Sequence, residues 1–186
     1  MGERGDRLRR ALTLGLAIAG LAGAADAAVI HVSPSGFELK QVVHISAPAE
    51  RVYAALIRPA LWWSPAHTYS GDAANLSLEA RAGGCFCEAL PKGGSARHLT
   101  VAMAAPGEEL LMRGAMGPFM RRGLDGALDI ALTPAGDGVD LTLSNDLGGY
   151  LPEGFDGWAV KADAMLADQM GRLKRYVETG SAAPEK

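Results

Sequence analysis

"KADAMLADQMGRLKRYVETG", residues 161–180, is the strongest indication of the fold, because its apolar residues recur at the spacing of one helix face. With the residues just before it, the apolar stripe comprises Trp158, Ala162, Met165, Leu166, Gln169, Leu173, Tyr176 and Val177. Gly180 is placed to end the helix. A long amphipathic helix at the end of the chain has to bury this stripe against another layer of structure.

The residues before this helix predict the layer that it covers. Phe37–Ile45 alternates apolar and polar residues and predicts a half-buried strand. Residues 46–63 predict two short helices separated by Pro59. Residues 75–146 predict antiparallel strands with glycine-rich turns, most clearly the hairpin "LDIALTPAGDGVDLTLSND" at 128–146. This order predicts an α+β fold in which a curved sheet grips the last helix and leaves a cavity between them.

The N-terminus predicts export. Residues 1–27 carry arginines at positions 4, 7, 9 and 10, then an apolar run of about 15 residues and an A-x-A site that ends at Ala27, which is the layout of a signal peptide. Because a bilayer span needs about 20 residues, an uncleaved anchor is the weaker alternative. We expect a periplasmic or secreted protein with one domain at 28–180, a flexible tail at 181–186 and no stable membrane anchor.

Charge and cysteine content narrow the classes of function. The net charge is -3, and removal of four arginines and three acids with residues 1–27 gives -4, with no basic block of the kind a nucleic-acid binder needs. Cys85 and Cys87 are two residues apart in a predicted strand, where Cα atoms are about 6.5 to 7 Å apart, so we expect two free, buried thiols. No metal-ligand spacing or phosphate loop accompanies them, and we expect neither metal nor cofactor.

Several segments together resemble one known superfamily: "ISAPAERVYAALIRPALWW" (45–63), "HTYSGDAANLSLEARAGGCFCE" (67–88), "LLMRGAMGP" (110–118), "NDLGGY" (145–150) and the last helix. They are similar to the bacterial helix-grip proteins called SRPBCC or START-like, in the polyketide cyclase/dehydrase-like or chaperone-ATPase-activator-like branches. The resemblance covers about residues 37–180. It implies a deep apolar cavity and, most often, binding of a small molecule or lipid, but no particular reaction.

The candidate ligand-binding residues are those that could line such a cavity. Adjacent Trp62 and Trp63 follow a helix-breaking proline, so we expect one in the core and the other at the cavity. Gln169 lies within an apolar stripe, as Gln41 does on the first strand, and each needs a partner or a wet cavity. The remaining candidates are His67, Tyr69, Glu88, Arg113, Tyr150 and Met165, while the alternation of its strand places His98 outside.

Three functions are compatible with the sequence. The first is an exported protein that binds a small hydrophobic molecule, lipid-like or aromatic. The alternative is a cyclase- or dehydratase-type enzyme that uses acid and base groups among His67, Glu88, Arg113 and Asp146 in the same cavity. The third is a protein-interaction module. No nucleophile and base stand at a recognisable spacing, so the catalytic residues stay unassigned.

Overall fold

The computed structural model describes residues 26–184, in which eight antiparallel strands form one sheet of order β1-β2-β8-β7-β6-β5-β4-β3. The strands are β1 (Asp26–Ser33), β2 (Gly36–Ile45), β3 (Leu76–Leu78), β4 (Cys85–Leu90), β5 (Gly94–Ala105), β6 (Glu109–Arg113), β7 (Gly123–Ala135) and β8 (Gly138–Tyr150). Two α-helices accompany them within these residues, α1 (Ala49–Leu56) and α2 (Asp156–Thr179). Short 3-10 helices are η1 (Pro59–Leu61), η2 (Pro65–His67), η3 (Ala73–Asn75), η4 (Pro91–Gly93) and η5 (Gly117–Arg121).

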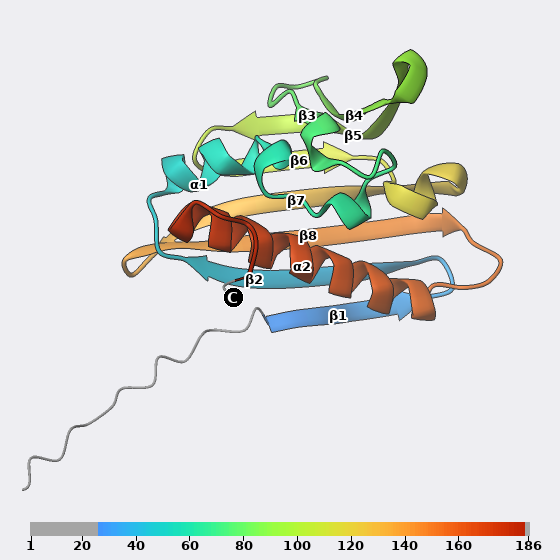
Figure 1. Cartoon of the computed structure of the whole chain (residues 1–186). Coiled ribbons are helices and arrows are strands. Elements are labelled where there is room, and N and C mark those ends of the chain that lie inside the picture. The colour runs from blue at the N-terminus through green and yellow to red at the C-terminus, as the bar shows by residue number, and fades with distance from the viewer. Residues whose placement is uncertain (1–25, 185–186) are drawn as a thin grey trace, which may run out of the picture.

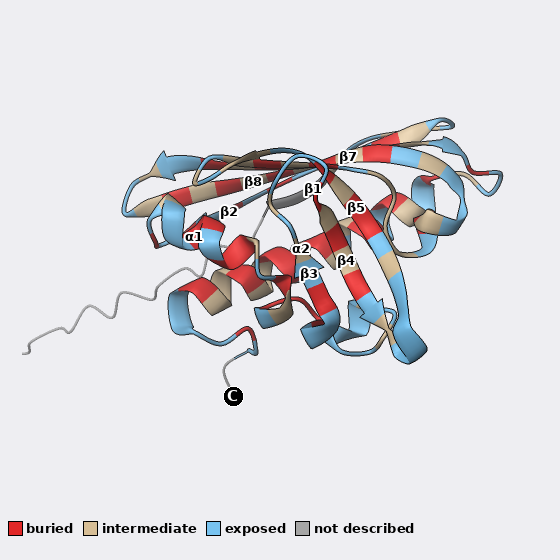
Figure 2. Cartoon of the chain, turned by 90° about the horizontal axis from the view of Figure 1, so that it is seen from above, coloured by how far each residue is buried: buried red, intermediate tan, exposed pale blue. Residues whose placement is uncertain are grey.

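The long helix α2 lies along one face of the curved sheet (Figure 1). In the view from above, buried residues gather between the sheet and α2, whereas exposed residues mark the outer surfaces (Figure 2). The expected helix-grip α+β fold is confirmed. The protein therefore has one core, between the concave face of the sheet and the helices that cover it.

The first predicted strand is confirmed as β2. Its burial alternates along the strand, and the inward residues are Phe37, Leu39, Gln41, Val43 and Ile45, as expected from the sequence. The predicted hairpin at 128–146 is confirmed as β7 and β8, in which Leu132 pairs with Leu141. Period-two burial of this kind requires a sheet with one face on the core.

The last helix is also confirmed, with its end at the predicted glycine. Gly180 adopts the left-handed conformation with φ of 81°, and its N–H donates to the Tyr176 carbonyl at 2.9 Å. Glycine adopts this conformation without steric cost and is the usual residue at a helix C-terminus. The buried face of α2 consists of Ala159, Ala162, Leu166, Gln169, Met170, Leu173 and Val177.

The edge strand β1 was not predicted from the sequence. It pairs with β2 in antiparallel register, so that the sheet gains a strand before Phe37. The predicted signal peptide lies outside the described residues except for residues 26 and 27, with which β1 begins. Cleavage after Ala27 would leave Ala28, which pairs with Lys40, as the first residue of the strand.

Candidate binding cavity

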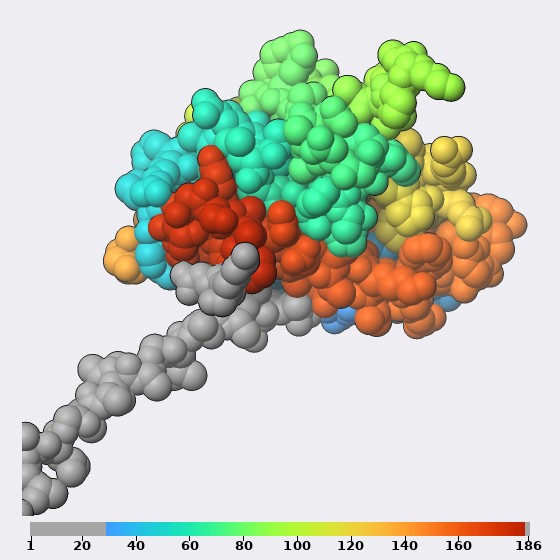
Figure 3. Space-filling view, viewed as in Figure 1, coloured from blue at the N-terminus to red at the C-terminus, as the bar shows by residue number. Residues whose placement is uncertain are grey.

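A cavity of about 450 Å³ opens between α2, the concave face of the sheet and the segments that follow η1 and β6. Its walls are mainly aromatic and aliphatic, formed by Trp63, Leu76, Phe86, Leu99, Met116, Phe119, Leu128, Leu147, Trp158, Met165 and Leu166. Polar side chains at its surface belong to His67, Thr68, Tyr69, His98, Asn145 and Lys161. Figure 3 views the molecule from this side, where η5 (yellow) and the segment around residues 60–75 (green) adjoin α2 (orange to red).

The two tryptophans divide between core and cavity. Trp62 is 2% exposed, does not line the cavity, and donates its indole N–H to the Ala55 carbonyl at 2.9 Å. Trp63 lines the cavity and donates its indole N–H to the His67 carbonyl at 3.0 Å. The ring of Trp63 also packs edge-on against Phe86, with centroids 5.4 Å apart. Trp63 is therefore the indole that a bound molecule would contact.

Helix α2 fixes the backbone of this tryptophan segment. Gln169 is fully buried, and its side-chain oxygen accepts the Ser64 N–H at 2.8 Å. The Arg172 guanidinium donates to the Trp62 carbonyl at 2.8 Å. Gln169 was a ligand-binding candidate, but it does not line the cavity. Its buried amide instead has the hydrogen-bond partner that the sequence required, and it positions the cavity wall at Ser64.

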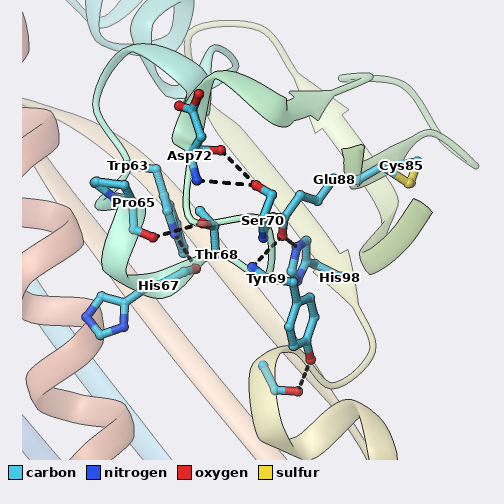
Figure 4. Close-up of polar contacts among 12 residues, drawn as sticks. Trp63, Pro65, His67, Thr68, Tyr69, Ser70, Asp72, Cys85, Glu88 and His98 are labelled. Atoms are coloured by element: carbon cyan, nitrogen blue, oxygen red, sulfur yellow. Dashed lines mark hydrogen bonds and ion pairs between the residues drawn. A yellow bond between two sulfur atoms is a disulfide. The ribbon is translucent and has the colours of Figure 1, made fainter. Parts of the chain in front are cut away.

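Residues His67 and Tyr69 lie at the rim of the cavity, and Met165 lines it from α2. The Tyr69 hydroxyl donates to the Gly117 carbonyl at 2.6 Å and so links this segment to η5. Figure 4 shows Tyr69 beside His98 and His67 farther along the same loop. The structure therefore brings three predicted candidates, His67, Tyr69 and Met165, to the same cavity.

Arg113 and Tyr150 lie elsewhere. The Arg113 side chain is exposed and pairs with Asp125 at 3.3 Å, and Tyr150 is 76% exposed at the end of β8. Asp146 is also exposed, because it alternates with the inward residues Asn145 and Leu147. The structure does not bring these three residues to the cavity.

Glu88 is the most enclosed ionisable group beside the cavity, at 1% exposed. Its carboxylate accepts hydrogen bonds from the backbone N–H of Tyr69 at 3.0 Å and of Ser70 at 2.5 Å. His98 Nε2 lies 2.9 Å from Glu88 Oε2 (Figure 4). Burial alone would raise the pKa of Glu88, but the hydrogen bonds from Ser70, Tyr69 and His98 outweigh it and lower the pKa. Glu88 is thus held as a carboxylate.

The prediction that His98 lies outside is wrong: it is 7% exposed and lines the cavity. The cause is a bulge between β4 and β5. Phe86 pairs with Leu99, but Cys87 pairs with Arg97, so His98 is an extra residue in β5. A bulge redirects the side chain that it inserts, and here both His98 and Leu99 are buried. The alternation of β5 alone gives no signal of this change.

The expectation of two free thiols is also contradicted, because Cys85 and Cys87 form a disulfide. Their Cα atoms are 5.3 Å apart, closer than in a regular strand. The register shift between Phe86 and Cys87 falls inside the loop that the disulfide closes, so the strand departs from regular geometry where the bond requires it. Both cysteines are half-buried.

Several lining residues were not identified from the sequence. Phe119 in η5 packs edge-on against Trp158 of α2, with ring centroids 5.3 Å apart. Lys161 lies 5.0 Å from the centre of the Trp158 ring and places a positive charge at the cavity. Trp158 was recognised only as part of the helix stripe, and Phe119 follows a turn signal that indicates no orientation. Asn145 interrupts the apolar row of β8, and that interruption was the available signal.

The described part of the chain contains no group of three or more His, Cys, Asp or Glu residues placed to hold a metal ion. Between residues 26 and 184, none of the helices combines the length and the apolar character required to cross a membrane.

Comparison with known proteins yields structural neighbours only. No family model matches the chain, and no curated protein matches it. A conserved protein of unknown function from Enterococcus faecalis is 20% identical, with a TM-score of 0.58 over 87% of this chain and 82% of that one. CalU16 from Micromonospora echinospora is 16% identical, with a TM-score of 0.57 over 87% and 88% of the two chains.

A third neighbour is DynU16, described as a protein in the dynemicin biosynthetic locus. It is 23% identical, with a TM-score of 0.53, and the match covers 78% of this chain and 48% of that one. At these identities the likeness concerns the fold. The class that the comparisons and the structure define is the helix-grip α+β fold with a cavity under its last helix.

Proposed function

We propose that this protein binds a small hydrophobic molecule, lipid-like or aromatic, in the cavity between the sheet and α2. The observation that carries the proposal is the cavity itself: about 450 Å³, with walls that are mainly apolar and aromatic. Pockets for small ligands have volumes of roughly 300 to 1,000 Å³ and walls of this character with a few polar groups. Trp63 supplies a large flat surface for stacking, and Lys161 favours a ligand with a polar or anionic end.

We further propose membership of the SRPBCC or START-like superfamily and export to the periplasm or beyond the cell. The helix-grip fold and the segments quoted above support the membership. The arginine-rich start and A-x-A site of residues 1–27 support export. The ligand would then be met outside the cytoplasm.

The test is mass spectrometry of small molecules that co-purify with residues 28–186. Ala162→Phe provides the comparison, because Ala162 lines the cavity and a benzyl group there would occupy it. Ala164→Phe is the matched control, since Ala164 is exposed on the same helix. We expect a hydrophobic compound with the unsubstituted protein and with Ala164→Phe, and its loss with Ala162→Phe. Equal recovery from both variants would contradict a site in this cavity.

The cyclase- or dehydratase-type enzyme remains the second candidate because of one observation. The cavity wall contains a histidine whose ring is hydrogen-bonded to a buried carboxylate, His98 and Glu88. Such a pair is the arrangement by which proteins orient a general base. Binding of a hydrophobic molecule alone requires no such pair.

A further inference from the structure

The Glu88–His98 pair fixes the proton arrangement of a histidine at the cavity. The Glu88 carboxylate has only acceptor atoms, and both backbone N–H groups that reach it, from Tyr69 and Ser70, are donors. The imidazole nitrogen beside it, His98 Nε2, must therefore carry a hydrogen. In a neutral imidazole the other nitrogen, Nδ1, then holds the lone pair.

Two aromatic rings also pack against the imidazole. The Tyr69 ring stacks on it, with centroids 5.5 Å apart and planes at 9°. The Phe86 ring lies 5.2 Å away at 38°. Tyr69 is itself fixed by its hydrogen bond to the Gly117 carbonyl. Because the ring cannot turn over without breaking its bond to Glu88, Nδ1 keeps one orientation.

Nδ1 of His98 is accessible. Within residues 26–184 it has no hydrogen-bond partner. The side-chain atoms there that are both unpartnered and fully enclosed are Gln41 Oε1, Tyr53 Oη and Asp129 Oδ1, so His98 Nδ1 is not one of them. It therefore keeps contact with solvent. The His98 side chain lines the cavity, so the cavity is the space beside the ring that carries this nitrogen.

We propose that His98 Nδ1 accepts the proton of a weakly acidic hydroxyl on a planar hydrophobic molecule, a phenol or an enol, bound in the cavity. The inference rests on the proposed binding function. In the transfer, the O–H bond of the ligand breaks, an N–H bond forms at Nδ1, and the electron pair stays on the ligand oxygen. The imidazolium that results faces the Glu88 carboxylate, which stabilises its charge.

The acidity of the hydroxyl limits the ligand class. An ordinary imidazolium ionises near pKa 6.5 and a phenol near 10, so proton transfer from a phenol to an imidazole is unfavourable by about 3.5 pH units, a gap that the adjacent Glu88 carboxylate narrows by stabilising the imidazolium. For a simple alcohol, with a pKa close to the 15.7 of water, the gap is about 9 pH units, which is too large to close. The flat aromatic walls formed by Trp63 and Phe86 suit the planar conjugated system that makes such a hydroxyl acidic.

The test compares 2-naphthol with its methyl ether, which has the same shape but no acidic proton, at constant near-neutral pH. Binding is measured by calorimetry, and ionisation by the absorbance band of bound naphtholate. The variants are His98→Phe, which keeps the aromatic stack, and His98→Gln, whose amide can still donate to Glu88 but is not basic. His31→Gln is the control, because His31 is an exposed histidine on β1.

We expect the unsubstituted protein and His31→Gln to bind 2-naphthol about tenfold more tightly than the ether and to show the naphtholate band. His98→Phe should bind both compounds equally, and His98→Gln should show no naphtholate band. Equal binding of the two by the unsubstituted protein, no binding of either, or binding without naphtholate would overturn the proposal. Binding of an apolar fluorophore in the same samples would show that the cavity function stands even then.

Discussion

The two buried glutamines should differ in how much stability is lost when their polar groups are removed. Gln169→Met deletes the oxygen that accepts the Ser64 N–H, and Ser64 is itself buried, so a backbone donor loses its partner. Gln41→Met deletes a donor to the Asp163 carbonyl and carboxylate. That carbonyl also belongs to α2 and keeps its helical bond, and the substitution removes a Gln41 oxygen that has no partner within the described chain.

The difference in stability follows from this asymmetry. A buried donor left without a partner costs about 1 to 3 kcal/mol. The Asp163 carboxylate is only half-buried, so it can bind water after Gln41→Met and its loss of a donor costs less. For a domain of this size each kcal/mol shifts the melting temperature by roughly 2 to 4 °C. For a cost of about 2 kcal/mol, the middle of that range, we expect Gln169→Met to lower the melting temperature by about 4 to 8 °C and Gln41→Met to lower it by less than about 3 °C. Differential scanning calorimetry of residues 28–186 measures both.

Binding provides a second measurement of the same substitution. Because Ser64 follows Trp63 directly, loss of the Gln169 bond should loosen the tryptophan wall and weaken binding of an apolar fluorophore. Gln41→Met should leave binding unchanged. Equal destabilisation by the two substitutions, or a larger loss for Gln41→Met, would show that the Gln169–Ser64 hydrogen bond does not stabilise the tryptophan segment.

Three further predictions concern the disulfide, a surface histidine and export. When the protein is alkylated in denaturant without reductant, intact-mass analysis should find Cys85 and Cys87 unmodified. Reduction should add the mass of two hydrogens. Alkylation of both cysteines without reductant would show that the disulfide does not form. Hydrogen bonds to Asp140 and Asp137 raise the pKa of His44 above its ordinary value of 6.5. The stability that these bonds give the fold is therefore fully present below pH 6.5 and is lost as the pH rises through the raised pKa. His44→Gln should therefore have a lower melting temperature than the unsubstituted protein at mildly acidic pH and the same melting temperature at alkaline pH. A difference in melting temperature that does not change with pH would contradict this role of His44. In a bacterium with its own envelope, N-terminal sequencing of the exported protein should begin at Ala28, and an intact Met1 recovered from the cytoplasm would contradict export.

The elements whose burial follows one regular period were predictable. The stripe that ends at Gly180 and the alternation of Phe37–Ile45 each report one buried face, because every inward residue belongs to the same element. The separation of Trp62 from Trp63 was predictable in kind, since adjacent residues cannot both face inward along a regular element. Which of the two lines the cavity depends on the path of the chain after Pro59 and on Gln169, which lies about a hundred residues later.

The features that were missed depend on pairing between strands. His98 faces inward because β5 has one more residue than β4 across the bulge, and the alternation of either strand alone does not reveal the difference. The register shift also falls between Cys85 and Cys87, whose Cα atoms are 5.3 Å apart. Arg113 was a candidate because it interrupts an apolar run, yet its position in β6 points it away from the core. Half-buried strands therefore predict the walls of the cavity better than its polar groups.

Titration of an apolar fluorophore into residues 28–186, Trp63→Leu and Trp62→Leu tests whether a hydrophobic binding site lies beside Trp63. Because Trp63 lines the cavity and Trp62 lies in the core, Trp63→Leu should weaken binding about fivefold with the smaller loss of stability. Trp62→Leu should lower the melting temperature more and leave the affinity of the folded protein nearly unchanged. Unchanged affinity in Trp63→Leu, or no binding by the unsubstituted protein, would contradict the account.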